Sequence, residues 1–599
     1  MADLDAKVAE WLKWDKNEAT SAALQALLAE QKFDEVERIL CNRISFGTAG
    51  LRGKMAVGYS NMNDLVIIQT AQGFLKYLVH TDEDLLKRNG IVVGYDGRHN
   101  SKRWAELTAT VFVNAGYPVK LFDDVVPTPF VPFSILRYGC ASGIVVTASH
   151  NPKDDNGYKV YGPNGAQICS PVDKHVQKSI LENLKPLDSS WDVTVLVNNP
   201  LVSNPIEEIT SCYLDYIDNE VPESCKETNK RADVAFTYTA MHGVGYKYVR
   251  KACDRINVRI SAVPQQRDPH PDFPTVTFPN PEEGKSSLEL SFKHADETNS
   301  RIILANDPDA DRFAMAEKHP STGTWKIFTG NELAALFAWW TLRCFKQRHQ
   351  HIPLSKVYMI SSTVSSMICK TMSQIEGFNY IDTLTGFKWI ANKALDLEKD
   401  GNKVIFAFEE AIGFMCSTRV LDKDGISALA QMATMVSFVY EEGKTMGQQL
   451  EDIYSKYGYH VTLNSYYICH EPAVIRRIFE RIRNYKGDKT YPESILNGKY
   501  TIRNVRDLTT GYDDNRPDKK AVLPVSSSSQ MITFNFDNGF VCTLRTSGTE
   551  PKIKYYTEMC ASPEMKNVDE LSSIVEEMVR GICHELLEPH KNNLKSQAA

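Results

Sequence analysis

The strongest constraint on the fold is the alternation of short, β-branched runs with helical patterns of about ten to sixteen residues. Runs such as 91–95 (Ile-Val-Val-Gly-Tyr) are almost continuously apolar, as expected for strands covered on both faces of a sheet. Strands that alternate with helices predict βαβ units with largely parallel sheets. The main strands are expected at 91–95, 143–147, 232–238, 301–305, 356–360 and 404–408, with helices at 65–80 and 101–115. The pattern predicts an α/β protein.

The pattern changes beyond about residue 461. A helix is expected at 473–483, strands at 531–536 and 541–545, and a last helix near 569–587, which together predict an α+β module. One amphipathic helix, running from Val8 to Leu28, is expected to open the chain. At about 150 residues per domain, the length suggests about four domains. Their expected bounds are 1–205, 206–330, 331–460 and 461–599, with polar linkers at 188–205 and 455–459.

The composition excludes several classes of protein. The 68 Lys and Arg against 75 Asp and Glu leave a charge of −7 spread along the chain, which gives no reason to expect nucleic acid or a membrane as partner. Residues 1–16 carry acidic side chains and lack the apolar run of a signal peptide. The 13 cysteines are odd in number and never spaced C-x-x-C, which indicates reduced thiols. A cytoplasmic protein is expected.

A serine loop follows the strand expected at 143–147. It reads Thr147-Ala148-Ser149-His150-Asn151-Pro152, and open α/β sheets bind their ligands in loops beyond the carboxyl ends of strands. An Asn-Pro turn after Ser149 would present its hydroxyl on a fixed loop; a capping serine in a turn is the alternative. A hydrolase elbow is excluded because Thr147 and Asn151 replace its glycines, and the side chains of adjacent Ser149 and His150 are not expected to face each other.

An acidic loop, 306–312 (Asn-Asp-Pro-Asp-Ala-Asp-Arg), follows the strand expected at 301–305. Carboxylates about 4 Å apart repel by roughly 4 kcal/mol at an effective dielectric constant of 20, so a cation is expected between them. Oxygen ligands favour Mg²⁺, with Mn²⁺ or Ca²⁺ as substitutes. An EF-hand would need Gly at Arg312 and Glu at Lys318, and an aspartyl phosphatase would have Thr at Asp311. A solvated acidic turn is the remaining alternative.

A third polar loop, 545–554 (Arg-Thr-Ser-Gly-Thr-Glu-Pro-Lys-Ile-Lys), follows the strand residues 541–544. Its arginine fork, hydroxyls and Gly548 suit phosphate oxygens, whereas a hydrophilic hairpin is the plainer alternative. Segment 47–54 is not a Walker A loop, because five residues separate Gly47 from Gly53 and Met55 replaces Ser or Thr.

Taken together, these segments resemble the α-D-phosphohexomutase superfamily over nearly the whole chain. The matching segments, in the order of that family, are its phosphate-contact loop (46–53), phosphoserine loop (147–152), magnesium loop (307–312), sugar loop (408–413) and distal phosphate loop (545–554). One such match is weak, but five in order are specific. Segments 46–52, 62–65 and 384–389 are most similar to the phosphoglucomutase 2 branch, which includes phosphopentomutase/phosphoglucomutase enzymes and a glucose 1,6-bisphosphate synthase.

The resemblance implies three consecutive mixed or parallel-sheet α/β domains and a C-terminal α+β domain around a central cleft, with one loop from each. Ser149 would carry the phosphoryl group and, with Asp307, Asp309 and Asp311, bind one Mg²⁺. Arg312 would steady the phosphoryl group. Lys159 would be the general acid/base, which requires a depressed pKa, or only an electrostatic clamp. The implied substrate contacts are Arg52, Ser149, Arg312, Thr385, Lys388, Glu409, Lys423, Arg545, Ser547, Gly548, Thr549 and Lys554.

The implied activity moves a phosphoryl group between C1 and C6 of a hexose (glucose), or C1 and C5 of a pentose (ribose or deoxyribose). A sugar bisphosphate would be the intermediate and a sugar 1,6-bisphosphate the activator. The expected protein is a monomer or weak dimer that binds sugar phosphates. Hexose-specific relatives have Ser where Ala411 stands, and one lost hydrogen bond, worth about 0.5–1.5 kcal/mol, favours tolerance of pentoses. A glucose 1,6-bisphosphate synthase using an acyl phosphate is the alternative. An inactive sugar-phosphate sensor is disfavoured because Ser149 and the acidic loop are intact.

Overall fold

The computed structural model describes residues 2–47, 49–487, 489–527, 529–547, 551–565 and 567–596. The described residues fall into two compact units. The first comprises Met1–Leu333, Phe387–Asp400 and Val404–Met446, and the second Ala334–Gly386, Gly401–Lys403 and Gly447–Ala599. No boundary between the four expected domains is tested by this division, so those bounds stay a prediction.

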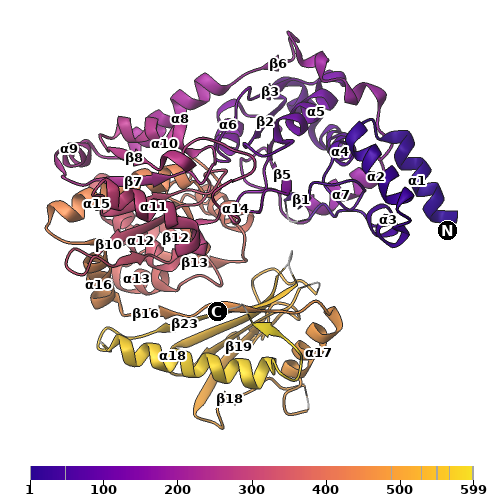
Figure 1. The fold of residues 1–599 in the computed structure, drawn as a ribbon. Helices are drawn as coiled ribbons and strands as arrows, with labels where there is room; N and C mark the ends of the chain where they lie inside the picture. The colour runs from indigo at the N-terminus through magenta and orange to yellow at the C-terminus, as the bar shows by residue number, and fades with distance from the viewer. Residues whose placement is uncertain are drawn as a thin grey trace. The chain divides into compact units, whose positions relative to one another are not determined.

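The first sheet of the first unit confirms the predicted parallel pattern. Its strands, in spatial order, are β1 (Gly50–Lys54), β5 (Asp155–Tyr161), β4 (Ser142–Val146), β2 (Ile91–Tyr95), β3 (Val119–Leu121) and β6 (Val202–Ser203). The strands from β4 to β6 are parallel, whereas β1 and β5 are antiparallel. Every residue of β2 and β4 is buried, because helices lie on both sides of the sheet (Figure 1). The surrounding helices are α4 (Asp64–Asn89), α5 (Ser101–Asn114), α6 (Phe130–Tyr138) and α7 (Val172–Leu181).

The second sheet of this unit repeats the arrangement. Its order is β11 (Trp325–Ile327), β10 (Ala314–Lys318), β9 (Ile302–Ala305), β7 (Phe236–Thr239) and β8 (Ile260–Ala262). β9, β7 and β8 are parallel, and β10 and β11 are antiparallel. Its helices include α8 (Ile206–Glu220), α9 (Glu223–Arg231), α10 (Gly245–Arg255), α11 (Lys285–Glu297) and α15 (Gly425–Glu441). The serine and acidic loops therefore both follow a buried parallel strand at its carboxyl end, where α/β sheets bind ligands.

Further α/β segments contribute to both units. In the first unit, α14 (Phe387–Lys399) precedes β14 (Lys403–Glu409), which turns back antiparallel into β15 (Gly413–Met415). In the second, β12 (Val357–Ser362) pairs parallel with β13 (Asn379–Thr383). The helices of this region of the second unit are α12 (Gly330–Arg348), α13 (Ile368–Glu376) and α16 (Met446–Tyr457).

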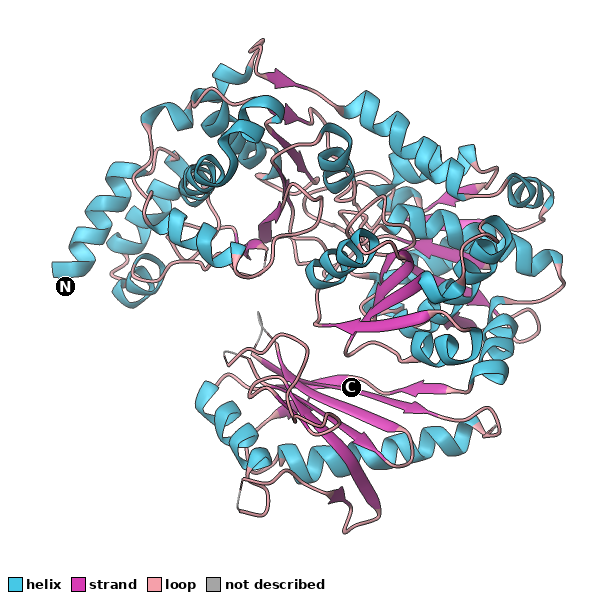
Figure 2. Cartoon of the chain, turned by 180° about the vertical axis from the view of Figure 1, so that it is seen from behind, coloured by secondary structure: helices cyan, strands magenta, loops and turns pink. Residues whose placement is uncertain are grey.

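The C-terminal part of the second unit is the predicted α+β module. Its sheet runs β18 (Ser494–Ile495), β19 (Tyr500–Asp507), β21 (Met531–Phe536), β22 (Phe540–Thr546), β23 (Lys552–Cys560), β17 (Ser465–Ile468) and β24 (Lys595–Ser596), with β16 (His460–Thr462) on β23 and β20 (Tyr512–Asp513) on β19. The module also contains α17 (Pro472–Arg483) and α18 (Val568–Ile582). Figure 2 shows α18 running along one face of this sheet. The strand at 531–536 has the bounds expected from the sequence.

The prediction of a single opening helix was wrong. It is two helices, α1 (Ala2–Trp14) and α2 (Glu18–Ala29), followed by α3 (Phe33–Leu40). The side chain of Asn17 accepts hydrogen bonds from the backbone N–H groups of Ala19 and Thr20. Such a cap begins a new helix rather than continuing the preceding one.

The predictions that segments 188–205 and 455–459 are linkers were also wrong. Segment 188–205 contains β6, which pairs in parallel with β3 at the edge of the first sheet. Segment 455–459 begins inside α16, which continues to Tyr457. Polar composition in these segments reflects partial exposure rather than the absence of regular structure.

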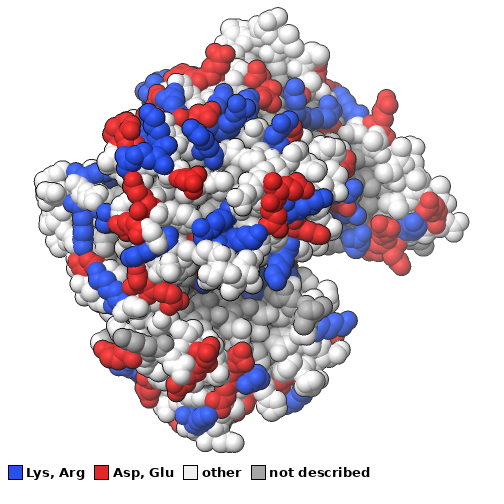
Figure 3. Space-filling view, turned by 60° about the vertical axis from the view of Figure 1, so that its left-hand side comes forward, with Lys and Arg blue, Asp and Glu red and all other residues white. Residues whose placement is uncertain are grey.

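The described helices include none long and apolar enough to cross a lipid bilayer. On the face drawn in Figure 3, acidic and basic side chains are interspersed rather than gathered by sign.

A partly buried carboxylate in the second unit makes the stability of that unit depend on pH. Glu376, at the end of α13, accepts hydrogen bonds from Lys346, Lys456 and Tyr457. Burial raises the pKa of Glu376, but these donors outweigh it and lower the pKa from 4.5 to about 2. Because the folded pKa lies below the unfolded one, the contribution to stability is complete above about pH 4.5 and disappears as the pH falls toward 2.

We therefore expect Glu376→Gln to lower the free energy of unfolding by about 2–3 kcal/mol at pH 7, with the difference from wild type shrinking at pH 3. Urea unfolding at both pH values measures this. Glu227→Gln, at an exposed position of α9, is the control and should change little at either pH. A loss of equal size at both pH values would contradict the role of the ionised carboxylate.

Candidate active site

The serine loop is held in an unusual backbone conformation. Ser149 has φ of +53°, a left-handed geometry that non-glycine residues adopt mainly where the surroundings enforce it. Its N–H donates to Thr147 Oγ1 at 2.8 Å, and that hydroxyl donates to Asp96 Oδ2 at 2.7 Å. The Ser149 side chain is buried, so the loop places one hydroxyl in a fixed, largely dry position.

A buried arginine anchors this loop through its backbone. The guanidinium of Arg98 donates to the carbonyl oxygens of Ser149 (2.5 Å), Asn151 (2.7 Å), Pro152 (2.8 Å) and Asp155 (3.2 Å). Its Nε donates to Asp96 Oδ2 at 3.1 Å. This pair was not predicted from the sequence, although a signal was present: Asp96 and Arg98 come directly after the apolar strand β2, as Ser149 comes after β4.

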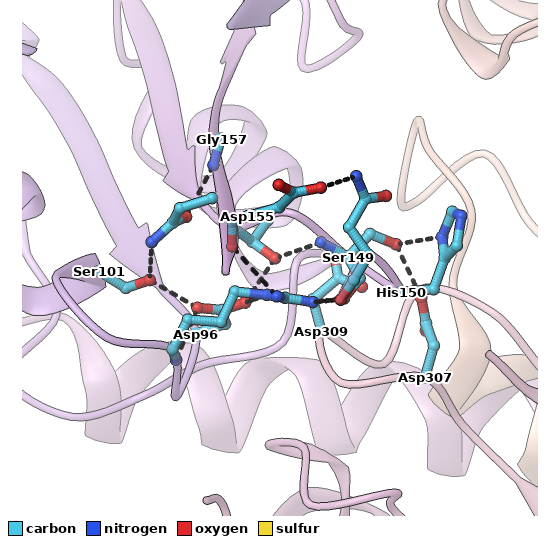
Figure 4. A network of polar contacts seen from close by, with 12 residues as sticks. Asp96, Ser101, Ser149, His150, Asp155, Gly157, Asp307 and Asp309 are labelled. Carbon is cyan, nitrogen blue, oxygen red and sulfur yellow. Dashed lines mark hydrogen bonds and ion pairs between the residues drawn. The ribbon is translucent and has the colours of Figure 1, made fainter. Parts of the chain in front are cut away.

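Three carboxylates meet beside the serine. Asp307, Asp309 and Asp311 are fully buried, and one oxygen from each lies within 4.8 Å of the others. Ser149 Oγ donates to Asp307 Oδ2 at 2.8 Å (Figure 4). Burial, followed by the charges of Asp309 and Asp311, raises the pKa of Asp307 well above its ordinary value. The two loops, 158 residues apart in sequence, thus form one site.

The acidic loop fits a divalent cation. Asp309 Oδ1 and Asp311 Oδ1 are buried and have no hydrogen-bond partner among the described residues, an arrangement that is costly for a carboxylate without a cation. All the available ligand atoms are oxygens, from three carboxylates and a serine, which suits Mg²⁺ better than a softer metal.

Two lysines face the same carboxylates. Lys159 Nζ lies 2.8 Å from Asp309 Oδ2 and 2.9 Å from Asp311 Oδ2, and Lys423 Nζ lies 3.2 Å from Asp311 Oδ2. Burial lowers the pKa of Lys159, but Asp309 and Asp311 outweigh that effect and raise it. The depressed pKa that a general base needs is therefore absent in this arrangement; a cation on the same carboxylates would act in the opposite direction.

Arg312 and Arg52 add donors near Ser149. The Arg312 backbone N–H donates to Asp307 Oδ1 at 3.0 Å, and its Nη1 donates to Glu282 Oε2 at 3.1 Å. Arg312 Nε is buried and has no hydrogen-bond partner among the residues that the structure describes. Arg52, on β1, donates to the Asn151 side chain at 3.5 Å. The two guanidinium groups suit the oxygens of a phosphoryl group.

The expectation that Ser149 and His150 would not face each other was wrong. His150 Nδ1 lies 3.3 Å from Ser149 Oγ, because the left-handed backbone of Ser149 turns the chain between the two side chains. Burial, then the charges of Arg312 and Arg52, lowers the pKa of His150 well below its ordinary value. The ring is therefore neutral near pH 7.

The first unit also contains Lys388, Glu409 and Lys423, three further expected substrate contacts. Lys388, in the first turn of α14, is buried, and burial lowers its pKa. Lys423 lies over the ring of Phe387 at 5.3 Å, and Glu409 ends β14. These residues belong to the same compact unit as Ser149, whereas Thr385 belongs to the second unit.

The distal phosphate loop lies in the second unit on the hairpin of β22 and β23. Arg545 and Lys554 are directly paired across these strands, so their side chains share one face, and Ser547 N–H donates to the Lys552 carbonyl at 2.9 Å. Gly548 and Thr549 lie outside the described residues. The described strands β22 and β23 are antiparallel neighbours, and they place two cationic side chains suited to phosphate on one face.

Comparison with known proteins identifies the family to which this chain belongs. Models of the phosphoglucomutase/phosphomannomutase α/β/α domains I, II and III match residues 43–186, 211–323 and 329–457. A phosphopentomutase from Homo sapiens is 49% identical over 100% of this chain and 98% of its own length. The chain belongs to the α-D-phosphohexomutase superfamily.

Other members of the superfamily are similar over comparable lengths. A human glucose 1,6-bisphosphate synthase is 47% identical, covering 99% of this chain and 95% of its own. A phosphoribomutase from Saccharomyces cerevisiae is 40% identical over 94% of each chain. The crystal structure of parafusin, a phosphoglucomutase from Paramecium, superposes with a TM-score of 0.67 at 17% identity, covering 92% of this chain and 96% of that one, and so shares the fold.

The anchoring role of Arg98 predicts a catalytic defect in Arg98→Lys. A lysine keeps the charge but cannot bond four carbonyls at once, so we expect kcat to fall by about 10- to 100-fold, since small displacements of a reacting group cost that much. Steady-state kinetics on sugar phosphates measures it, with Arg103→Lys, a half-exposed arginine of α5, as the matched control. A kcat equal to that of the control would contradict the role.

The acidic loop predicts dependence on a divalent cation. EDTA should abolish turnover and Mg²⁺ restore it, and Asp309→Asn should weaken Mg²⁺ binding by about 100-fold or more, since loss of even an outer-shell partner costs 10- to 100-fold. Calorimetric titration with Mg²⁺ measures the affinity independently of activity. Asp123→Asn, an exposed position, is the control; turnover indifferent to EDTA would remove the acidic loop from the reaction.

Proposed function

We propose that this chain is a phosphosugar mutase, an intramolecular phosphotransferase that interconverts ribose or deoxyribose 1-phosphate and 5-phosphate, and glucose 1-phosphate and 6-phosphate. The observation that carries the proposal is the Ser149 hydroxyl, 2.8 Å from Asp307 at the edge of three buried carboxylates. Similarity along the whole chain to proteins named phosphopentomutase and phosphoribomutase supports pentose phosphates as substrates.

In the proposed cycle, phosphorylated Ser149 transfers its phosphoryl group to the free hydroxyl of a sugar monophosphate. The Ser149 O–P bond breaks as the sugar O–P bond forms, and the resulting bisphosphate turns round and returns its other phosphate to Ser149. Mg²⁺, held by Ser149, Asp307, Asp309 and Asp311, would neutralise the local charge and polarise the phosphoryl oxygens. A sugar 1,6-bisphosphate would prime the enzyme by phosphorylating Ser149.

The remaining side chains orient the reactants. Arg312, whose Nε has no partner among the described residues, would bind the phosphoryl oxygens. Lys159 would receive the proton of the attacking hydroxyl once a cation on Asp309 and Asp311 lowers its pKa, or would serve, still charged, as a clamp for the phosphate. The neutral ring of His150, 3.3 Å from Ser149 Oγ, would add a hydrogen bond without adding charge. Holding the reactants in line in this way supplies several kcal/mol of the lowering of the barrier.

Further side chains would bind the rest of the substrate. Arg52, Lys388, Glu409 and Lys423 would bind the sugar and its near phosphate, together with Thr385. Arg545, Ser547, Gly548, Thr549 and Lys554 would hold the phosphate that is not reacting. Binding energy from this remote phosphate would be used to orient the reacting end. The four-domain division and a cytoplasmic location stay predictions.

A second candidate function is synthesis of glucose 1,6-bisphosphate from an acyl phosphate and glucose 1-phosphate. The observation that favours it is the 47% identity, over 99% of this chain, to a protein of that name. The same serine would first take the phosphoryl group from the acyl phosphate and then transfer it to the sugar. The two activities differ in the donor, so substrate rates separate them.

Ser149→Ala tests the nucleophile. We expect turnover to fall by at least about 10⁴-fold, as for other enzymes that lose their nucleophile, while sugar-phosphate binding is retained. Intact-mass analysis after incubation with glucose 1,6-bisphosphate and Mg²⁺ should find one added phosphoryl group in wild type and in the control, Ser203→Ala, at an exposed position. Absence of phosphorylation at Ser149 in wild type would refute the cycle.

A substrate panel tests the choice of reaction. Initial rates are compared for ribose 1-phosphate and glucose 1-phosphate, each with glucose 1,6-bisphosphate as primer, and for glucose 1-phosphate with 1,3-bisphosphoglycerate. We expect ribose 1-phosphate to be isomerised fastest, because Ala411 offers no hydroxyl to a hexose. Net formation of glucose 1,6-bisphosphate faster than either isomerisation would favour the synthase instead.

A further inference from the structure

The first unit contains a cavity apart from the phosphoserine site. It has a volume of about 420 Å³ and lies between α4, the start of α7, the segment 162–169 and α14. Its walls are mainly apolar and include Phe74, Leu78, Ile168 and Val172. A cavity of this size with mostly apolar walls and a few polar groups suits a small organic ligand.

Segment 162–169 joins this cavity to the acidic loop. One side of it lines the cavity, while Gln167 Nε2 donates to Asp422 Oδ2 at 2.8 Å. Tyr161, which also lines the cavity, donates to the same oxygen at 2.6 Å. The next residue, Lys423, contacts Asp311 Oδ2 at 3.2 Å. Two short steps, through Asp422 and Lys423, therefore connect the cavity wall to the carboxylates beside Ser149.

A second connection runs through α14. Asn392 lines the cavity and donates to the carbonyl oxygens of Gln167 (3.2 Å) and Lys388 (2.7 Å). Ala166 packs against Ala391 and Leu421 in a small buried cluster. Because Lys388 is one of the expected sugar contacts, a shift of segment 162–169 would reach the substrate site by this path as well.

The charge of the cavity indicates which ligands it accepts. Among the residues that line it, Asp82 is the only Asp, Glu, Lys or Arg, and burial raises the pKa of the Cys169 thiol. Asp82 is exposed and lies at the kink of α4, where its φ and ψ are −158° and 76°. A carboxylate at the edge of an apolar cavity attracts a cation and repels phosphate, so sugar phosphates are poor ligands here.

We propose that this cavity binds a small organic amine with an apolar body, its ammonium group toward Asp82, and that binding alters the substrate site through segment 162–169. The binding claim stands on the cavity alone. The effect on catalysis rests on the proposed mutase activity, so binding and catalysis are measured separately.

The binding test uses three probes of similar shape on the full-length enzyme: 2-phenylethylamine, 2-phenylethanol and phenylacetate. In saturation-transfer NMR titrations, the amine should bind most tightly, the alcohol less tightly and the carboxylate most weakly. The affinity for the amine should exceed that for the alcohol by about 2- to 5-fold, as for a partly exposed ion pair. Asp82→Asn should remove the preference for the amine. Failure of all three probes to bind, or phenylacetate binding as tightly as the amine, would overturn the proposal.

Substitutions that fill the cavity with a larger side chain test whether the amine binds there. Val172→Trp and, at an exposed position of the lining, Thr81→Trp should each reduce amine binding by about tenfold or more. Val197→Trp, at a position 70% exposed outside the cavity, should bind as wild type does. Two variants that fill the cavity are used, so that the test can still be made with one if the other does not fold. If a variant that fills the cavity folds and binds the amine as wild type does, the assignment of the site is wrong.

Coupling to the substrate site is tested with Gln167→Ala. Saturating 2-phenylethylamine should change the KM of wild type for ribose 1-phosphate by about twofold or more, whereas Gln167→Ala should bind the amine and show a smaller change. Amine binding without any change in wild-type kinetics would refute the coupling and leave the binding site intact. An enzyme that binds the amine but isomerises no sugar phosphate would refute the proposed function instead.

Discussion

Concentrated negative charge beside one hydroxyl is the interaction on which the site depends. Three carboxylates, fully buried and within 4.8 Å of one another, repel strongly unless cations hold them. Lys159 and Lys423 contact them directly, and two of the carboxylate oxygens have no partner among the described residues. A phosphorylated Ser149 would add a further charge of about −1.5 to −2. The site is therefore suited to a bound cation and to moving phosphate.

The backbone around the serine is held as firmly as the carboxylates. Arg98 bonds four carbonyl oxygens of the loop while Asp96 balances its charge. Because the pair is buried, loss of either partner would leave an uncompensated charge. This arrangement maintains the left-handed conformation of Ser149, and that conformation brings His150 against the nucleophile. Positioning of the hydroxyl thus depends on residues that never touch the substrate in the proposed cycle.

Sequence identity to relatives shows the superfamily of this chain but does not distinguish between the two candidate reactions. Identity near 50% along the whole chain places it in the superfamily, but relatives of nearly equal identity carry names for two different reactions. The serine, the acidic loop and Arg312 would serve both proposed reactions, because both would pass through the same phosphoserine. The two proposed reactions would therefore differ in the donor and in the contacts of the sugar loop, and the substrate panel compares them.

The amino-acid sequence by itself determined the α/β class, the serine and acidic loops at strand ends, and the C-terminal α+β module, because apolar strands and clustered polar residues are local patterns. It did not reveal the break at Asn17, the strand at 202–203, or the Asp96–Arg98 anchor. Only the tertiary structure decided that Ser149 contacts Asp307, that His150 faces the serine, and that Lys159 lies on the carboxylates. Those contacts join segments far apart in sequence or depend on a single backbone angle, and neither leaves a periodic signal in the chain.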